Sequence, residues 1–104
     1  GEDAVRVAVD VAALVAPHKK KHGRLALRVE RLPQKARFSK GSRNNDGSWS
    51  LATDELDDLV YLLDKDIARA HTLAIRVISL PGGDTLAVIE HHVTPGEAPA
   101  PPAA

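Results

Sequence analysis

The stretch RNNDGSWSL, residues 43–51, allows two interpretations that differ in whether the chain holds a chemical site. The polar residues NND ahead of Gly47 look like the start of a calcium-binding loop. The same residues also fit a tight turn that leads into a strand anchored by Trp49, the one tryptophan of the chain. Asp46-Gly47 is a typical turn pair, and the indole of Trp49 is large enough to fill a core. We therefore predict a turn followed by a core strand.

The calcium interpretation fails as an EF-hand but stays open in a looser form. An EF-hand-type loop needs glycine at position 6 and a bidentate glutamate at position 12. With Gly47 at position 6, position 12 falls on Thr53, which cannot supply a carboxylate. The chain is therefore expected to have no cofactor, and the alternative is a calcium site with three candidate ligands: Asp46, Asp54 and Asp57.

Length and composition predict one domain with a modest core. The chain has 104 residues, of which 43% are apolar and 3% aromatic, so aliphatic side chains must fill the interior. There is no cysteine, which excludes disulfides and thiolate metal sites. No apolar run approaches the roughly 18 residues that a membrane span requires. We expect a domain over residues 4–94, followed by a proline- and alanine-rich linker or disordered tail over residues 95–104.

Alternating apolar residues predict strands along much of the chain. AVRVAVDVAALV, residues 4–15, and GRLALRVERLP, residues 23–33, both alternate with a period of two. KARFSKG, residues 35–41, suits a further short strand around Phe38. The runs HTLAIRVISL and DTLAVIEHHV are joined by PGGD, residues 81–84, which predicts a β-hairpin. On the second of these strands His91 and His92 would point to opposite faces.

One segment supports either a helix or a turn and a strand. TDELDDLVYLLDKDIARAH, residues 53–71, places leucine, valine and isoleucine at helical spacing behind a Thr53 N-cap. Periodicity alone slightly favours a helix over residues 54–70, which would make the fold α+β. The rival is a single turn at residues 54–57, then a short strand over residues 59–63.

The charges are separated along the sequence although the net charge is zero. Residues 1–43 carry 11 of the 14 basic side chains and 4 acidic ones, whereas residues 44–104 carry 3 basic and 10 acidic ones. Strands from the two parts would interleave in a sheet, so solvated charges on strands and loops are the expected outcome. The alternative is that opposite patches survive folding and let copies of the chain associate.

The run HKKKH, residues 18–22, is a candidate binding surface. Two histidines four residues apart would share a helix face and could hold zinc. Pro17 before the run and Gly23 after it argue against a helix, so we expect an exposed basic loop with no metal. Such a loop could contact an anionic polymer. The candidate contact residues are Lys19, Lys20, Lys21, Arg24, Lys40 and Arg43.

Enzyme signatures are absent from the sequence. It has no glycine-rich phosphate loop, no G-x-S-x-G and no H-E-x-x-H. The carboxylates of residues 54–58 suit a helix start or a turn better than an acid–base pair. We therefore expect a protein that is not an enzyme and has no catalytic residues.

Residues 27–79 resemble the cadherin-like and immunoglobulin-like repeats of very large bacterial surface and RTX-type proteins. The most specific part of the resemblance is N-D-G-S-W, residues 45–49, with Leu51 and Leu56 after it. The strand that ends near L-P, the S-x-G segment and the acidic D-x-L turn also fit. The chain departs from the pattern in its charged DKDIARAH segment and in lacking D-x-N-D-x-x-P calcium motifs, so calcium-rigidified linkage is not implied.

The resemblance implies an all-β, antiparallel immunoglobulin-like sandwich of about seven strands with Trp49 in the core. It also favours the turn and strand over a helix at residues 54–70. Such repeats are non-catalytic structural or adhesion modules of secreted or cell-surface proteins. Their partners would be neighbouring domains of the same polypeptide or a cell-surface polymer, while nucleic acid is not expected. The alternative function is a binding module for an anionic polysaccharide or another polyanion, through the basic residues named above.

Overall fold

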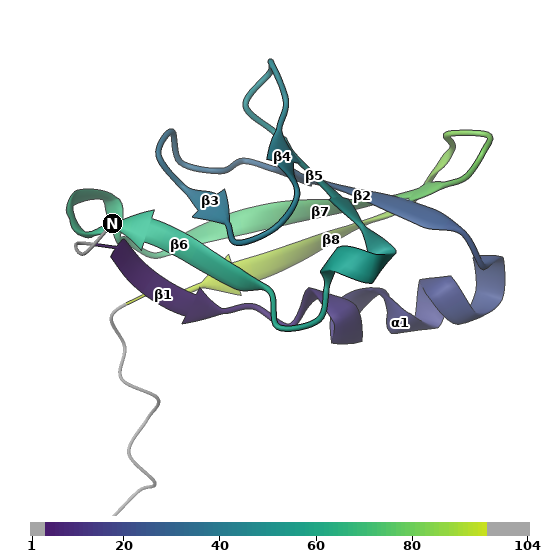
Figure 1. The fold of residues 1–104 in the computed structure, drawn as a ribbon, viewed down its shortest axis with the longest axis horizontal. Coiled ribbons are helices and arrows are strands. Elements are labelled where there is room, and N and C mark those ends of the chain that lie inside the picture. The colour runs from purple at the N-terminus through teal and green to yellow at the C-terminus, as the bar shows by residue number, and fades with distance from the viewer. Residues whose placement is uncertain (1–3, 96–104) are drawn as a thin grey trace, which may run out of the picture.

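The strands of this chain form two antiparallel sheets (Figure 1) in a computed structural model that describes residues 4–95. A three-stranded sheet has the order β1-β6-β3, and a five-stranded sheet has the order β4-β5-β2-β7-β8. The predicted all-β sandwich is therefore confirmed, with one helix added. The strands are β1 (Ala4–Ala8), β2 (Leu25–Glu30), β3 (Arg37–Phe38), β4 (Ser42–Arg43), β5 (Trp49–Ala52), β6 (Val60–Asp64), β7 (His71–Ser79) and β8 (Thr85–Val93).

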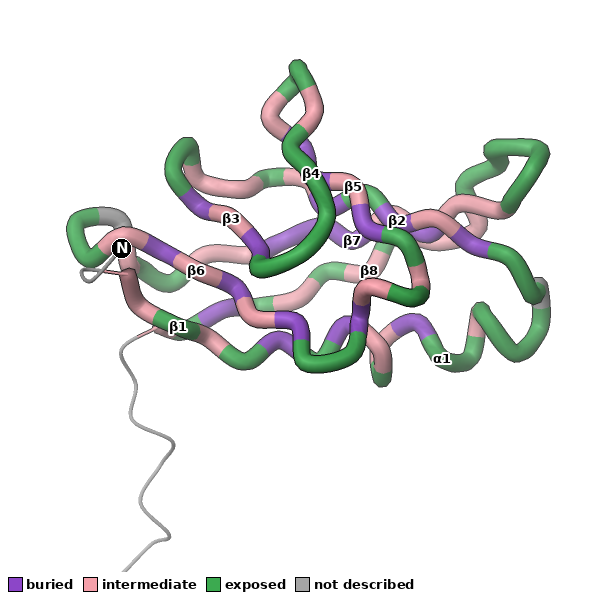
Figure 2. The backbone as a smooth tube through the Cα atoms, in the orientation of Figure 1, coloured by how far each residue is buried: buried purple, intermediate pink, exposed green. Residues whose placement is uncertain are grey.

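The core lies between the sheets and is made by alternate residues of their strands (Figure 2). Leu27 and Val29 of β2 are 2% and 0% exposed, and Ile75 opposite Val29 on β7 is 0% exposed. From the other sheet, Tyr61 and Leu63 of β6 are both 0% exposed. Each such side chain contributes about 1.5–3 kcal/mol by leaving water. The sandwich is thus held together mainly by aliphatic burial, as the composition predicted.

The C-terminal hairpin is confirmed. β7 and β8 pair antiparallel over their length, and the positive φ of the turn, 83°, falls on Gly83. The Gly83 N–H donates to the Ser79 carbonyl at 2.7 Å. The register passes from Val77 opposite Ala87 to Ile78 opposite Thr85, so β8 has one extra residue near the turn. That residue is a β-bulge, which adds local twist to the strand.

The predicted strand over residues 4–15 is wrong in its second half, because residues 11–22 form helix α1 (Val11–His22). The Asp10 side chain accepts a hydrogen bond from the Ala13 N–H at 3.0 Å and so caps the helix. Val11 and Val15, four residues apart, are 0% and 1% exposed. The alternating valines run on into VAALVA, residues 11–16, and this pattern fits a strand and a helix equally well. The Asp10 cap is what favours the helix.

The basic loop predicted at residues 18–22 is also wrong, because the helix continues through Pro17 to His22. Proline cannot donate the hydrogen bond that the Ala13 carbonyl would accept in a regular helix. Both residues lie on the exposed side of α1, where solvent can hydrogen-bond the freed carbonyl. The helix ends where Gly23, with φ of 81°, donates its N–H to the Lys19 carbonyl at 2.8 Å.

The helix expected from periodicity over residues 54–70 is not formed, and the rival turn and strand are confirmed. A 3₁₀ turn, η1 (Thr53–Glu55), precedes β6, and a second one, η2 (Lys65–Ile67), follows it. A helix would have placed Tyr61 away from the leucine face. In the strand, Tyr61 and Leu63 both point into the core, which buries more apolar surface. Tertiary burial therefore overrides local periodicity here.

Trp49 is 9% exposed and closes the core at the end where β3, β4 and β5 meet. Its ring centroid lies 6.0 Å from that of Phe38, and its Nε1–H donates to the Lys40 carbonyl at 2.7 Å. Gly41, next to that carbonyl, packs directly on Trp49. A Cβ on Gly41 would lie 2.3 Å from the Ser50 carbonyl oxygen and 2.6 Å from Trp49 Nε1. Only glycine fits against the indole at this position.

The substitution Gly41→Ala tests this packing, with Gly47→Ala as the matched control. The two glycines have nearly equal φ values of 85° and 88°, but a Cβ on Gly47 meets nothing within 4 Å. We expect Gly47→Ala to lower the free energy of unfolding by about 1–2 kcal/mol through backbone strain alone. Gly41→Ala should lower it by about 2–5 kcal/mol, because overpacking adds about 1–3 kcal/mol to the same strain. Urea unfolding followed by circular dichroism measures both, and equal losses would contradict the packing.

Candidate functional site

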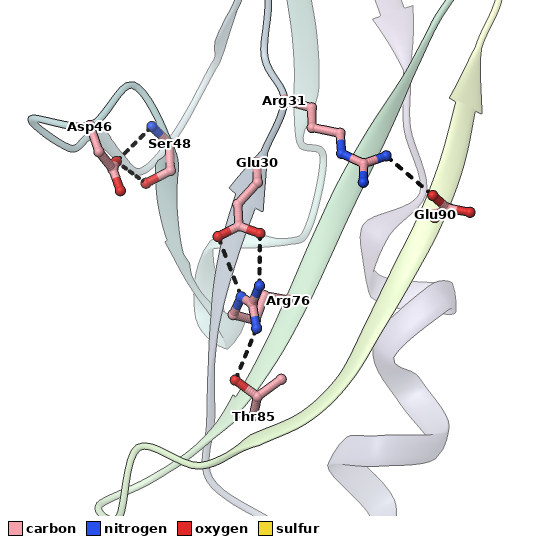
Figure 3. Close-up of polar contacts among 7 residues, drawn as sticks. All are labelled: Glu30, Arg31, Asp46, Ser48, Arg76, Thr85 and Glu90. Atoms are coloured by element: carbon pink, nitrogen blue, oxygen red, sulfur yellow. Dashed lines mark hydrogen bonds and ion pairs between the residues drawn. The ribbon is translucent and has the colours of Figure 1, made fainter.

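Residues 44–48, between β4 and β5, form a tight turn whose polar groups bond to one another. The Gly47 N–H donates to the Asn44 carbonyl at 3.0 Å. The Asn44 amide nitrogen donates to the hydroxyl oxygens of Ser48 and Ser50, both at 2.9 Å. The Asp46 carboxylate accepts from the Ser48 N–H at 2.9 Å and from the Ser48 hydroxyl (Figure 3). The motif that resembled a calcium loop is thus engaged in turning the chain toward Trp49.

The hydrogen bonds to Asp46 set its electrostatics. The Ser48 hydroxyl, and after it the Ser48 N–H, lower the pKa of the Asp46 carboxyl below its ordinary value. Hydrogen bonds that satisfy the ionised form have this effect. Asp46 therefore stays charged as a turn-stabilising acceptor.

The three calcium candidates are not brought together. Asp46 precedes β5, whereas Asp54 and Asp57 follow it, so they lie at opposite ends of this strand. Within residues 4–95, no three side chains of the metal-ligating types are grouped as a site. The absence of a cofactor stays the prediction, and the calcium alternative has no pre-arranged ligand set among residues 4–95.

Two of the six predicted polyanion-contact residues, Arg43 and Lys40, bond through their side chains to backbone carbonyls. The Arg43 guanidinium lies 5.4 Å from the Trp49 ring centroid and donates to the carbonyls of Ala36 and Gly47. The Lys40 ammonium donates to the Asp57 carbonyl. Both cations hold connecting segments in place, which the sequence pattern did not reveal.

The other four contacts, Lys19, Lys20, Lys21 and Arg24, gather at the C-terminal end of α1. All four are exposed, and within residues 4–95 none has a described hydrogen bond or ion pair from its side chain. Cations at this end of a helix are favoured by its macrodipole. The fold therefore brings four of the six predicted contact residues together at one end of α1.

An open cleft of about 590 Å³ separates this end of α1 from the η1 segment. Its floor is apolar and includes Val15 and Leu56. Lys19 and Lys20 line it on the helix side, and acidic residues of η1 and of the turn after it line it on the other. The opposite charges partly cancel each other's field across the cleft, which weakens the attraction for a polyanion. The acidic residues are Asp54 and Asp57.

The charges separated along the sequence are interleaved in the fold, as expected for strands from both halves. Arg76 donates to both carboxylate oxygens of Glu30, at 3.1 and 3.3 Å, and its third nitrogen reaches Thr85 (Figure 3). Arg31 pairs with Glu90 at 3.2 Å, and both side chains are more than 60% exposed. An exposed pair of this kind contributes only about 0–1 kcal/mol. A third pair, Arg37 with Asp64, joins the two halves of the sequence at 3.3 Å.

A Tyr61–His71 hydrogen bond is a feature that sequence reasoning missed. The His71 Nδ1 lies 2.7 Å from the Arg69 carbonyl, so it carries the proton and donates to this oxygen. The Nε2 then accepts from the Tyr61 hydroxyl at 2.9 Å. Burial raises the pKa of the Tyr61 phenol above its ordinary value. The pair therefore satisfies a buried hydroxyl at the edge of the core.

His91 is half-buried and His92 is exposed, which confirms the prediction that these neighbours on β8 point to opposite faces of the strand.

The sheets end in strands that have a neighbour on one side. Within residues 4–95, β1 pairs with β6 alone, and β8, the nine-residue edge of the five-stranded sheet, pairs with β7 alone. Val88 on β8 is 46% exposed. Free backbone N–H and C=O groups on such edges are the usual sites of strand addition.

The fold defines an antiparallel β-sandwich domain with one helix. No family model, no curated protein and no solved structure matches the chain. None of the helices among residues 4–95 has the length and apolar character needed to cross a membrane.

The Asp46–Ser48 hydrogen bonds predict how the turn responds to pH. Because the folded pKa of Asp46 is lowered, its contribution to stability is present above the ordinary value of about 3.9. It is lost as the pH falls through the folded pKa. We expect Ser48→Ala to raise the pKa of Asp46, since the hydroxyl is the largest cause of the lowering. NMR titration of the Asp46 carboxyl measures this. Asn45→Ala, in the same turn, is the control, and an unchanged Asp46 pKa in Ser48→Ala would contradict the assignment.

Proposed function

We propose that this domain is a non-catalytic structural and adhesion module of a larger bacterial extracellular or cell-surface protein. It would be an immunoglobulin-like or cadherin-like repeat that contributes spacing, adhesion or assembly. Its partners would be neighbouring domains of the same polypeptide or a polymer of the cell surface.

The observation that carries this proposal concerns the N-D-G-S-W motif, residues 45–49, whose polar groups bond to other groups of the same domain. Asp46 and Asn44 bond within their own turn, and Trp49 is bound by its indole N–H to the Lys40 carbonyl. The residues that could have formed a chemical site thus position a core tryptophan between two sheets. A spacer or adhesive repeat needs a stable fold and no chemical site, so a motif that stabilises the fold supports the proposed role. The sandwich also supports this role because its exposed sheet edges remain available for contacts.

Antibody labelling of cells that produce the parent polypeptide tests the proposal. An antibody raised against folded residues 4–95 should label intact cells, because a surface module is accessible from outside. An antibody to a cytoplasmic protein should label only permeabilised cells and is the control. Labelling by the domain antibody only after permeabilisation would overturn the extracellular role.

A second candidate function is polyanion binding at the C-terminal end of α1. The observation that favours it is the group of exposed cations there. Lys21 lines neither this cleft nor its neighbour, whereas Arg24 lines the neighbouring cleft together with Asp54. The sulfate groups of a sulfated polysaccharide would bind these cations without needing a shaped pocket. The acidic side of the cleft argues for a weaker site than the sequence run alone implied.

Dextran sulfate titrations at increasing salt distinguish the two functions. Polyanion binding should weaken steeply with salt, with a slope that reports the number of neutralised charges. The double substitution Lys21→Glu and Arg24→Glu should then weaken binding at least about tenfold, because it turns two attractions into repulsions. Lys35→Glu, an exposed cation between β2 and β3, is the matched control. Absence of binding at low salt would exclude the second function and leave the first.

A further inference from the structure

The edges of β1 and β8 complement each other in residue type and in the side on which each residue points. On β1, Val5 and Val7 lie opposite the buried Leu63 and Tyr61, so they point inward and Arg6 points outward. On β8, Ile89 lies opposite the buried Ile75. By alternation His91 also points inward, whereas Val88, Glu90 and His92 point outward.

One antiparallel register matches both faces of these edges. It places Arg6 opposite Glu90 on the outer face and Val7 opposite Ile89 on the inner face. Ala8 then lies opposite the exposed Val88. A shift of two residues in one direction sets Arg6 against Val88 and loses the charge pair. A shift in the other direction sets Arg6 against His92, which has no negative charge, so the charge pair is lost there too. Opposite charges across a strand pair favour one register over its neighbours.

Both charged residues are available for such a pair. Arg6 is exposed, and within residues 4–95 it has no described hydrogen bond or ion pair. Glu90 is 67% exposed in its side chain, and its present partner Arg31 is 62% exposed. A solvent-exposed ion pair holds its members weakly, so Glu90 can contact a second cation on the other side of β8. The β-bulge lies before Ala87, which leaves the proposed stretch of β8 regular.

We propose that a second copy of this chain adds its β1 edge to the β8 edge, antiparallel and with Arg6 of one copy against Glu90 of the other. The five-stranded sheet of one copy then continues into the three-stranded sheet of the next. Each copy has both edges, so the same pairing can be made reciprocally in a two-fold dimer or be repeated in an open chain of copies. This inference goes beyond the proposed function, because edge pairing is independent of cell-surface location and of polyanion binding.

Disulfide trapping tests the register directly, since the chain has no cysteine of its own. Two single variants, Ala8→Cys and Val88→Cys, are mixed at high concentration and oxidised. Residues directly opposite in a strand pair have Cβ atoms about 4.5–5.5 Å apart, close to disulfide range. We expect a mixed dimer from this pair, and likewise from Ala4→Cys with His92→Cys.

The same variants in other combinations supply the controls. A parallel alignment would instead join Ala8→Cys with His92→Cys, and a two-fold β8 contact would join Val88→Cys to itself. Lys35→Cys with Val88→Cys measures random surface collision. The proposal is overturned if either alternative combination forms as fast as the predicted one, or if the predicted pair forms no faster than the Lys35→Cys control.

A charge exchange provides a second readout that a purely structural role would not move. Arg6→Glu alone and Glu90→Arg alone should each weaken self-association by about tenfold, measured by sedimentation equilibrium, because each places like charges opposite. The double variant Arg6→Glu/Glu90→Arg restores the pair with its signs exchanged and should return to within about threefold of the original association. Failure of the double variant to recover, with both single variants folded by circular dichroism, would overturn the proposal.

Discussion

The burial of one indole side chain determines how the two sheets meet. Trp49 can enter the core only if its N–H finds an acceptor, and the Lys40 carbonyl supplies it at 2.7 Å. That carbonyl reaches the ring because Gly41 lacks a Cβ and lets the backbone approach. Phe38 then packs between Trp49 and Tyr61, with centroid distances of 6.0 and 4.8 Å. A row of three rings therefore links β5 of one sheet to β3 and β6 of the other.

The same region explains why polar residues with an apparent site pattern serve the fold. A strand that must deliver a tryptophan into the core needs the chain to reverse just before it. Asp46, Gly47 and Ser48 make that reversal with hydrogen bonds inside the turn, and Arg43 covers the outer face of the indole. The cost of burying the indole N–H and the Ser48 hydroxyl is offset by partners earlier in the same segment, at separations of 9 residues for the indole and 2 for the hydroxyl. Local satisfaction of polar groups is what makes a small sandwich with few aromatic residues feasible.

Sequence reasoning predicted the elements whose signals are local and unambiguous. The alternation at Leu25, Leu27 and Val29 and the hairpin at residues 71–93 are both present. It failed where two periodicities coincide. In residues 4–15 the valines at even spacing continue into a segment where Val11 and Val15 also satisfy a helix. The deciding group was the Asp10 cap, a single side chain.

The prediction for the segment after β5 failed for a different reason. Its apolar residues do have helical spacing, but the segment folds as a turn and a strand. Leu56, Leu59 and Leu63 would form one helix face, yet all three are buried in a turn and strand. The gain is Tyr61, which in the strand reaches both Phe38 and His71. The candidate site was predictable only as residue types. That Lys40 and Arg43 bond to backbone carbonyls, while Lys21 and Arg24 stay exposed, depends on contacts between segments distant in sequence.

Edge strands connect the architecture to what the domain can do with other molecules. Two separate sheets, unlike a closed barrel, leave four edges, and unprotected edges associate without selectivity. Here the exposed centre of each long edge carries a charge, Arg6 on β1 and Glu90 on β8. A single charge opposes pairing with a copy of its own edge, because the like charges would lie close together. It favours pairing with the other edge, where the opposite charge occupies the matching position. The charge on each edge therefore has two effects in the proposed pairing. It opposes association of like edges, and it selects the partner edge and its register.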